Sequence, residues 1–256
     1  MAYSIAVAGK GGTGKTTVCG LIINYLAEYG GGPVLAVDAD ANSNLNEVLG
    51  VEVETTLGEI REEVAKGDGF VPTGMSKQDY TEYRFEDALS ERDGYDLLVM
   101  GRTQGQGCYC FVNGLLQTQI ARYAGGYKYM VVDNEAGMEH ISRGILPQVN
   151  VILLVSDCSR RGIQAVGRIK ELIADVGLKT DRIGLIVNMV PEDGLADGIR
   201  EEIEKYGLEL FAAIPRDRAV YEYDSSGKAL VGLPEDNPVK QAVSRLMRKL
   251  EAERTA

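Results

Sequence analysis

The sequence predicts an α/β fold in which helices cover both faces of a mostly parallel β-sheet, within a single domain that spans residues 1–256. Short apolar, β-prone runs alternate with longer segments whose apolar residues recur at helical spacing, a pattern typical of parallel sheets. The chain has 256 residues and is 45% hydrophobic, which is enough to bury one large core. Ligands of such folds bind beyond the carboxyl ends of the strands.

The apolar runs predict strands at Ser4–Ala8, Val34–Asp38, Leu97–Gly101, Tyr129–Asp133, Val151–Ser156, Ile183–Asn188 and Leu208–Ile214. The helical spacing predicts helices at Thr16–Tyr29, Thr56–Glu63, Phe111–Tyr123, Glu139–Leu146, Ser159–Val176, Leu195–Tyr206 and Pro238–Glu253. Residues 64–95 are the least regular part of the chain, and we interpret them as an insertion or a mobile pair of surface helices.

The composition argues against several classes of function. A net charge of −11 and a pI near 4.8 disfavour a general binder of nucleic acid or of anionic membranes. A strand begins within three residues of the N-terminus, which leaves no room for a signal peptide. No apolar run approaches the roughly 20 residues of a membrane span. The four cysteines are therefore expected to be thiols or metal ligands in a cytoplasmic protein.

Residues 9–16 match the P-loop pattern G-x-x-x-x-G-K-[ST] between an apolar strand and a helix. Glycines let backbone N–H groups close around phosphate oxygens at the positive end of the helix. The sequence therefore predicts a nucleoside triphosphate site. We expect Lys15 to reach the β- and γ-phosphates and the Thr16 hydroxyl to bind Mg²⁺. The nucleotide-binding residues expected in this loop are Gly11, Gly12, Thr13, Gly14, Lys15, Thr16 and Thr17.

Acidic residues end two of the predicted strands. At Asp38 and Asp40, one carboxylate can enter the Mg²⁺ shell while the other orients or deprotonates the attacking water. The alternative is an acidic loop that caps the next helix. Asp133 ends an apolar strand as a Walker B residue does, and such a residue holds Mg²⁺ through water. Gly137 follows four residues later and could bring its N–H to the γ-phosphate.

Two features at later strand ends could form a base pocket. Asn188 ends a predicted strand, and its amide could both donate to and accept from the edge of adenine. Pro215 lies in the segment 214–217, which could wall the base. Ordinary turns are the alternative for both.

Cys108 and Cys110 are one residue apart in a glycine-rich stretch. This spacing disfavours a disulfide between them, but both thiolates can chelate one metal ion. A symmetric dimer would supply four thiolates, which suit tetrahedral Zn²⁺ or square-planar Ni²⁺. The alternative is a pair of buried cysteines. Core packing explains Cys19 and Cys158, and a structural role is favoured for His140.

Lys10 directly follows the first glycine of the P-loop, so residues 10–16 resemble the deviant Walker A motif. That motif defines the family of MinD, ParA and the nitrogenase iron protein. Within it, Cys108-Tyr109-Cys110 and the segment 133–140 resemble the CooC group of ATPases. Those proteins assist nickel insertion into carbon monoxide dehydrogenase, and similar proteins serve acetyl-CoA synthase. The resemblance covers nearly the whole chain.

The resemblance implies a homodimeric ATPase that uses ATP, ADP and Mg²⁺ and delivers nickel to such a client enzyme. It implies that Lys10 reaches the partner's phosphates and that Asp40 activates water. It also implies that Asp38 and Asp133 serve Mg²⁺ and that Asn188 reads adenine.

Differences between this sequence and other members of the family argue against the functions of those members. The segment 133–140 has no cysteine for a cluster like that of the iron protein. Little chain follows the last predicted helix, so a MinD-like membrane tail is not expected, and the acidic charge does not suit ParA-like DNA binding. A MinD/ParA-like positioning switch without metal delivery stays open as the alternative, and so does a carrier of electrons or of an iron cluster.

Overall fold

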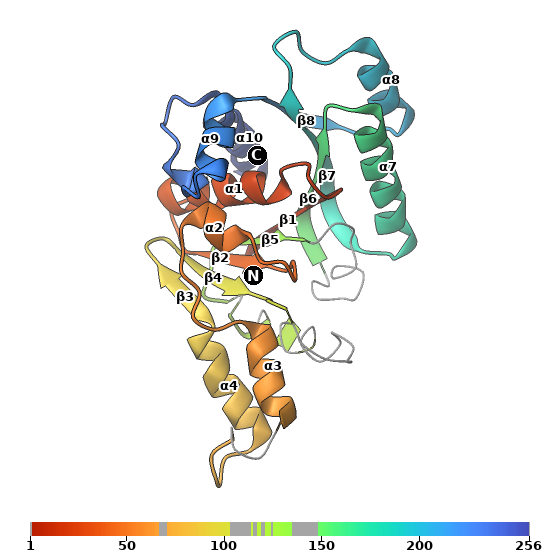
Figure 1. Cartoon of the computed structure of the whole chain (residues 1–256). Coiled ribbons are helices and arrows are strands. Elements are labelled where there is room, and N and C mark those ends of the chain that lie inside the picture. The colour runs from red at the N-terminus through yellow and green to blue at the C-terminus, as the bar shows by residue number, and fades with distance from the viewer. Residues whose placement is uncertain are drawn as a thin grey trace.

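The computed structural model describes residues 2–66, 71–102, 114, 117–118, 121–123, 125–134 and 148–255. Its centre is an eight-stranded sheet in the order β3-β4-β2-β5-β1-β6-β7-β8 (Figure 1). The strands are β1 Tyr3–Gly9, β2 Val34–Asp38, β3 Leu89–Arg92, β4 Tyr95–Val99, β5 Tyr129–Asp133, β6 Gln148–Asp157, β7 Lys179–Val190 and β8 Leu210–Pro215. Among these eight strands, only the β3–β4 pair is antiparallel. The predicted α/β fold with a mostly parallel sheet is confirmed.

The helices are α1 Lys15–Tyr29, α2 Leu45–Leu49, α3 Leu57–Lys66, α4 Lys77–Asp87, α7 Arg160–Asp175, α8 Asp197–Lys205, α9 Arg218–Ser225 and α10 Pro238–Thr255, with a short 3₁₀ turn η1 at Leu230–Gly232. In Figure 1, α3 and α4 form a hairpin that extends away from the sheet. Among the described residues, we find no helix with the length and apolar character needed to cross a bilayer.

Alternate side chains of the strands pack into two separate cores. On β1, Ile5 and Val7 belong to one core, and Ala6 and Ala8 belong to the other. Helices α1 and α10 complete the first core, whereas α3, α7 and α8 complete the second. A strand that is buried on both faces needs apolar residues at every position. This double burial explains why the central strands are continuous apolar runs.

Four elements were not predicted: β3, α2, α9 and η1. Strand β3 reads Leu-Ser-Glu-Arg and lies half-exposed at the sheet edge, where polar residues are tolerated. Helices α2 and α9 have only five and eight residues, so they offer little periodicity to detect. The irregular stretch 64–95 holds the end of α3, all of α4 and β3.

Strands β6 and β7 extend beyond the predicted ranges at both ends. Their pairing begins with Gln148 opposite Lys179, because backbone ladder bonds form regardless of side-chain polarity. Of the predicted helix at Phe111–Tyr123, the described residues 114, 117–118 and 121–123 are helical. The predicted helix at Glu139–Leu146 lies outside the described residues.

Candidate functional site

The P-loop connects the carboxyl end of β1 to α1. At Gly14 the backbone has φ of +84°, and a Cβ atom there would lie 2.3 Å from Nδ2 of Asn188. Only glycine adopts this conformation at no steric cost while leaving room for that neighbour. Helix α1 begins directly after Gly14. The free N–H groups of its first turn and the helix dipole favour a bound phosphate.

The two lysines of this loop have different surroundings. Lys15 is 7% exposed, and its Nζ donates to the carbonyl oxygen of Lys10 at 3.4 Å. The hydroxyl of Thr13 donates to the same carbonyl at 2.9 Å. The side chain of Lys10 is exposed. Lys15 is thus held inside the loop, and Lys10 lies on the surface, where a second molecule could meet it.

Candidate magnesium ligands meet at the carboxyl ends of β2 and β5. Asp38 and Asp133 are paired in register on these strands and are almost completely buried. The side chain of Thr16 hydrogen-bonds Asp133, whose Oδ1 has no hydrogen-bond partner among the described residues. A buried, unsatisfied carboxylate oxygen beside a hydroxyl fits a hard cation that prefers oxygen ligands. Thr16 and Asp133 would hold Mg²⁺, and the ion would neutralise phosphate charge there.

Asp38 has a structural task as well. Its Oδ1 accepts a hydrogen bond from the N–H of Asp40 at 3.0 Å, and its Oδ2 accepts one from the N–H of Leu45 at 3.0 Å. Asp38 therefore shapes the loop between β2 and α2. Each carboxylate oxygen keeps a second lone pair, so a role of Asp38 toward Mg²⁺ stays a prediction.

Burial raises the pKa of both carboxyls. The pKa of Asp133 rises to about 7, chiefly by desolvation, and the hydrogen bond from Thr16 opposes the rise. The pKa of Asp38 rises to about 6, again chiefly by desolvation, and the hydrogen bond from the N–H of Leu45 opposes it. Without a cation, the folded protein therefore holds protons that an unfolded chain would release near pH 4.

These pKa values predict an unusual pH dependence of stability in EDTA. Between about pH 4 and pH 7 the folded state binds more protons than the unfolded state, so the free energy of unfolding falls as the pH rises. Asp133→Asn removes the larger shift and should be more stable than the wild type at pH 8 by on the order of 2–4 kcal/mol. Urea unfolding of both proteins at pH 5 and pH 8 measures this. If the free energy of unfolding changed with pH by the same amount in both proteins, the raised pKa would not belong to Asp133.

Asp40 lies at the partly exposed outer turn of the same loop. Its Oδ1 accepts a hydrogen bond from the N–H of Asn42 at 2.8 Å. The side chain of Asn42 in turn accepts from Nη2 of Arg102, just beyond β4, at 2.7 Å. Ser43 has φ of +50°, which is uncommon for a residue with a side chain. The loop is thus held by local side-chain bonds rather than by sheet pairing.

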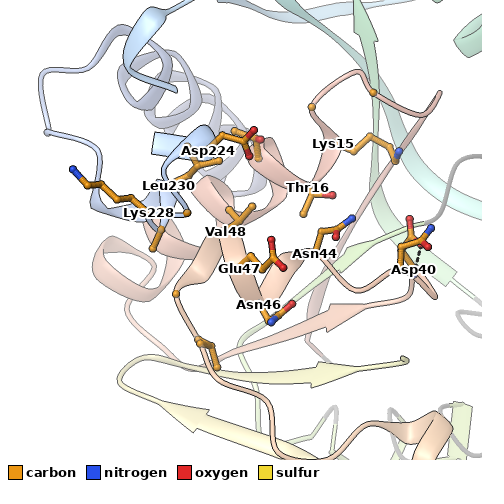
Figure 2. A pocket seen from close by; sticks show the side chains of 18 of the residues that line it. Lys15, Thr16, Asp40, Asn44, Asn46, Glu47, Val48, Asp224, Lys228 and Leu230 are labelled. Atoms are coloured by element: carbon orange, nitrogen blue, oxygen red, sulfur yellow. Dashed lines mark hydrogen bonds between the residues drawn. The ribbon is translucent and has the colours of Figure 1, made fainter. Parts of the chain in front are cut away.

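A pocket of about 820 Å³ extends from the P-loop (Figure 2). Its volume suits a ligand of nucleotide size. Three segments line it: the P-loop, residues 40–52, and residues 224–230, which run from the end of α9 to the start of η1. Several lining residues carry no motif, so the sequence did not indicate them. They include Asn44, Glu47, Val48, Asp224, Lys228 and Leu230.

The wall formed by α2 lies close to α1 because α1 carries a glycine at the contact. A Cβ atom on Gly20 would lie 2.3 Å from Cγ1 of Val48, and Val48 lines the pocket. At such a distance the Val48 side chain or α2 itself would have to shift. The absence of a side chain at position 20 therefore leaves room for Val48, a residue that lines the pocket.

The two residues predicted to bind adenine are not among those that line this pocket. Nδ2 of Asn188 donates to the carbonyl of Thr13 at 2.9 Å, and its Oδ1 accepts from the N–H of Met189 at 2.9 Å. Asn188 thus supports the P-loop from the end of β7. Pro215 ends β8 just before α9, whose N-terminus is capped by Asp217. A contact of either residue with adenine stays a prediction.

The predicted metal ligands Cys108 and Cys110 lie outside the described residues, as do Gly137 and His140. In the part of the chain that the structure describes, no group of three or more His, Cys, Asp or Glu side chains could hold a metal ion. The metal assignment therefore rests on the sequence.

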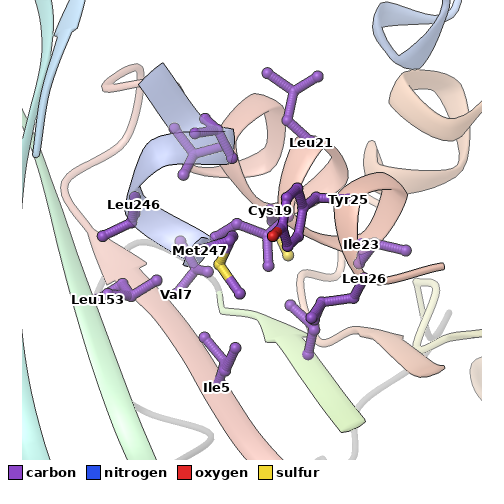
Figure 3. Packing of buried hydrophobic residues seen from close by; sticks show 14 of the residues in the cluster. Ile5, Val7, Cys19, Leu21, Ile23, Tyr25, Leu26, Leu153, Leu246 and Met247 are labelled. Carbon is purple, nitrogen blue, oxygen red and sulfur yellow. The ribbon is translucent and has the colours of Figure 1, made fainter. Parts of the chain in front are cut away.

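The other two cysteines lie within the described chain. Cys19 is fully buried in the core between α1, α10 and the sheet, where Figure 3 shows it near Tyr25 and Met247. Cys158 is half-buried and packs against the opposite core. The predicted packing roles of both cysteines are confirmed.

Comparison with known proteins identifies the family. Residues 4–231 match the CobQ/CobB/MinD/ParA nucleotide binding domain. An uncharacterised ATP-binding protein of Methanocaldococcus jannaschii is 42% identical, over 96% of this chain and 97% of its own. The carbon monoxide dehydrogenase accessory protein CooC of Rhodospirillum rubrum is 31% identical, over 87% of each chain.

Solved structures support the same fold. The septum site-determining protein MinD of Pyrococcus horikoshii, solved with Mg-ADP, superimposes with a TM-score of 0.71 at 23% identity, over 98% of this chain and 96% of its own. ATP or ADP with Mg²⁺ is the ligand expected for a nucleotide-binding domain of this family. The chain is an ATPase that belongs to the CobQ/CobB/MinD/ParA family of P-loop nucleotide-binding proteins.

Proposed function

We propose that this ATPase is a metallochaperone, a cytoplasmic homodimer that binds nickel at cysteine pairs shared across its two-fold axis. It would assist insertion of that nickel into an enzyme of the carbon monoxide dehydrogenase or acetyl-CoA synthase type. The observation that carries the proposal is the pair Cys108 and Cys110 in a chain that is similar to CooC along most of its length. Zn²⁺ would fit the same four thiolates.

The P-loop side chains would couple nucleotide to dimer closure. Lys15 would leave the Lys10 carbonyl and bind the phosphates of its own nucleotide, while the exposed Lys10 would reach those of the partner subunit. Two acidic side chains would bind Mg²⁺ and activate the attacking water. Asp133 would hold Mg²⁺ together with Thr16, and Asp40 would accept the proton of the attacking water. Hydrolysis would remove the γ-phosphate that joins the subunits and so relax the dimer.

Metal stoichiometry tests the proposal. Purified protein should bind one Ni²⁺ or Zn²⁺ per dimer, as measured by metal analysis with equilibrium sedimentation. Cys108→Ala and Cys110→Ala should each abolish tight binding, because the two thiolates that remain in a variant dimer leave the shell incomplete. Cys158→Ala is the matched control, since this half-buried cysteine should leave the stoichiometry unchanged.

Two metal ions per dimer, or binding that survives both substitutions, would overturn the shared site. Protein that binds no metal but co-sediments with liposomes or DNA in the presence of ATP would instead indicate a positioning switch of the MinD/ParA type. A coloured, iron-containing product would indicate a cluster carrier.

A further inference from the structure

Met189 has an unusual backbone conformation at the end of β7, next to the P-loop. Its φ is +57°, in the left-handed region. Glycine adopts such a value at no cost, whereas a residue with a long side chain is strained there. A glycine at this position would relieve the strain. The presence of methionine therefore calls for a task that its side chain performs.

A β-bulge produces this conformation. Strand β7 keeps its pairing with β6 as far as Asn188. Against β8, Val187 pairs with Ala213. The next pair is Val190 with Pro215, so two residues of β7 lie opposite one residue of β8. Bulges of this kind turn a side chain out of the regular alternation of a sheet, and they are common beside active sites.

Asn188 ties the bulge to the P-loop. Its Oδ1 accepts a hydrogen bond from the N–H of Met189 at 2.9 Å, and its Nδ2 donates to the carbonyl of Thr13 at 2.9 Å. From this anchor the Met189 side chain extends to the last glycine of the loop. Its Cε would lie 3.8 Å from a Cβ atom on Gly14, an ordinary van der Waals distance. The thioether is therefore held beside the turn whose N–H groups favour a bound phosphate.

Contacts within the subunit leave much of this side chain uncovered. Met189 is 42% exposed, so burial offsets only part of the strain. On the α2 side of the pocket, Val48 and Leu230 are 9% and 2% exposed and belong to one small apolar cluster. Those two side chains already cover each other. Of the three, Met189 has by far the most apolar surface left for a ligand.

We propose that Met189 forms one face of the nucleobase site, with its thioether against the ring of a nucleotide whose phosphates are bound at the P-loop. Methionine makes favourable contacts with aromatic rings and adapts its shape to them. The contact with the base offsets the strain that the free protein keeps at this residue. Met189 covers the face of the ring and leaves its edge to polar groups. The inference rests on the ATP site alone and is independent of metal delivery.

Ligands with and without a base test the inference. Met189→Ala should raise the Kd of Mg-ADP about three- to tenfold, because it removes an apolar contact with the ring. The Kd of Mg-pyrophosphate should be unchanged, because this ligand has no base. Met189→Leu keeps an apolar side chain and should recover most of the ADP affinity. Met75→Ala is the matched control, since this methionine is 39% exposed just before α4 and should affect neither Kd.

Met189→Gly separates the contact with the base from the backbone strain. Glycine adopts φ of +57° without strain, so the urea midpoint of the nucleotide-free protein should be higher for Met189→Gly than for Met189→Ala. Both variants should nevertheless bind Mg-ADP equally weakly. Equal urea midpoints would remove the strain on which the inference depends.

Three results of the binding measurements would overturn the inference. Equal losses of ADP and pyrophosphate affinity in Met189→Ala would show that the substitution disturbs the P-loop. A loss of ADP affinity in Val48→Ala but not in Met189→Ala would place the base against α2. Normal ADP affinity together with weaker ATP-dependent dimerisation in Met189→Ala would assign the side chain to the subunit interface.

Discussion

Lys15→Ala is expected to weaken ATP binding by about 30- to 1000-fold. Lys15 is buried in the P-loop, and within the described part of the chain its Nζ donates only to the Lys10 carbonyl, at 3.4 Å, so a phosphate oxygen is a better partner for its charge. Loss of one charged partner from a desolvated pair costs roughly 2–4 kcal/mol. Isothermal titration with ATP and Mg²⁺ would measure the change in Kd.

Lys10→Ala tests whether Lys10 has a different role from Lys15. The Lys10 side chain is exposed, so ATP should bind a monomer of this variant with nearly normal affinity. If Lys10 reaches the phosphates of the partner subunit, turnover and ATP-dependent dimerisation should fall, with kcat lowered on the order of 100-fold or more, as for other cations supplied in trans. Lys179→Ala, at the exposed start of β7, should change neither quantity. Normal ATP hydrolysis by Lys10→Ala would contradict the trans assignment.

Asp40→Asn is expected to lower kcat by about 10²- to 10⁴-fold while ATP still binds. A general base contributes a factor of that size, and an asparagine cannot accept the proton. The substitution keeps an acceptor for the N–H of Asn42, which now bonds Oδ1 at 2.8 Å. The loop should therefore retain its shape. Single-turnover hydrolysis, with ATP affinity measured in parallel, gives both quantities.

Asp40→Ala is the companion variant. It removes both the base and the loop bond, so it should be at least as slow as Asp40→Asn. If Asp40 only shapes the loop, Asp40→Asn should hydrolyse ATP at close to the wild-type rate and only Asp40→Ala should be slow. That result would rule out proton acceptance by Asp40.

The central sheet could be predicted because its strands are buried on both faces. At β1, β2 and β5 nearly every position must be apolar, and the run ends where the chain enters the polar site, as at Asp38 and Asp133. β3 could not be predicted in this way. Among the described strands it pairs with β4 alone, at the edge of the sheet, and its half-exposed sequence carries no burial pattern.

The phosphate end of the site was predicted, and its opposite wall was not. Phosphate binding needs a left-handed backbone at Gly14 and a charged side chain at Lys15. Few residue types meet either requirement. The wall at Val48, Asp224 and Leu230 depends on where α2, α9 and η1 pack. That packing is tertiary information, and many residue types are compatible with it.

The contact between Gly20 and Val48 has an evolutionary consequence. Because a Cβ atom at position 20 would lie 2.3 Å from Cγ1 of Val48, the two positions share one fixed volume. A homologue that gains a methyl group at position 20 should lose volume at position 48, because the methyl group would otherwise clash with Val48. Paired substitutions at positions 20 and 48 would then indicate selection on the width of the nucleotide pocket. Only one of the two residues, Val48, lines that pocket.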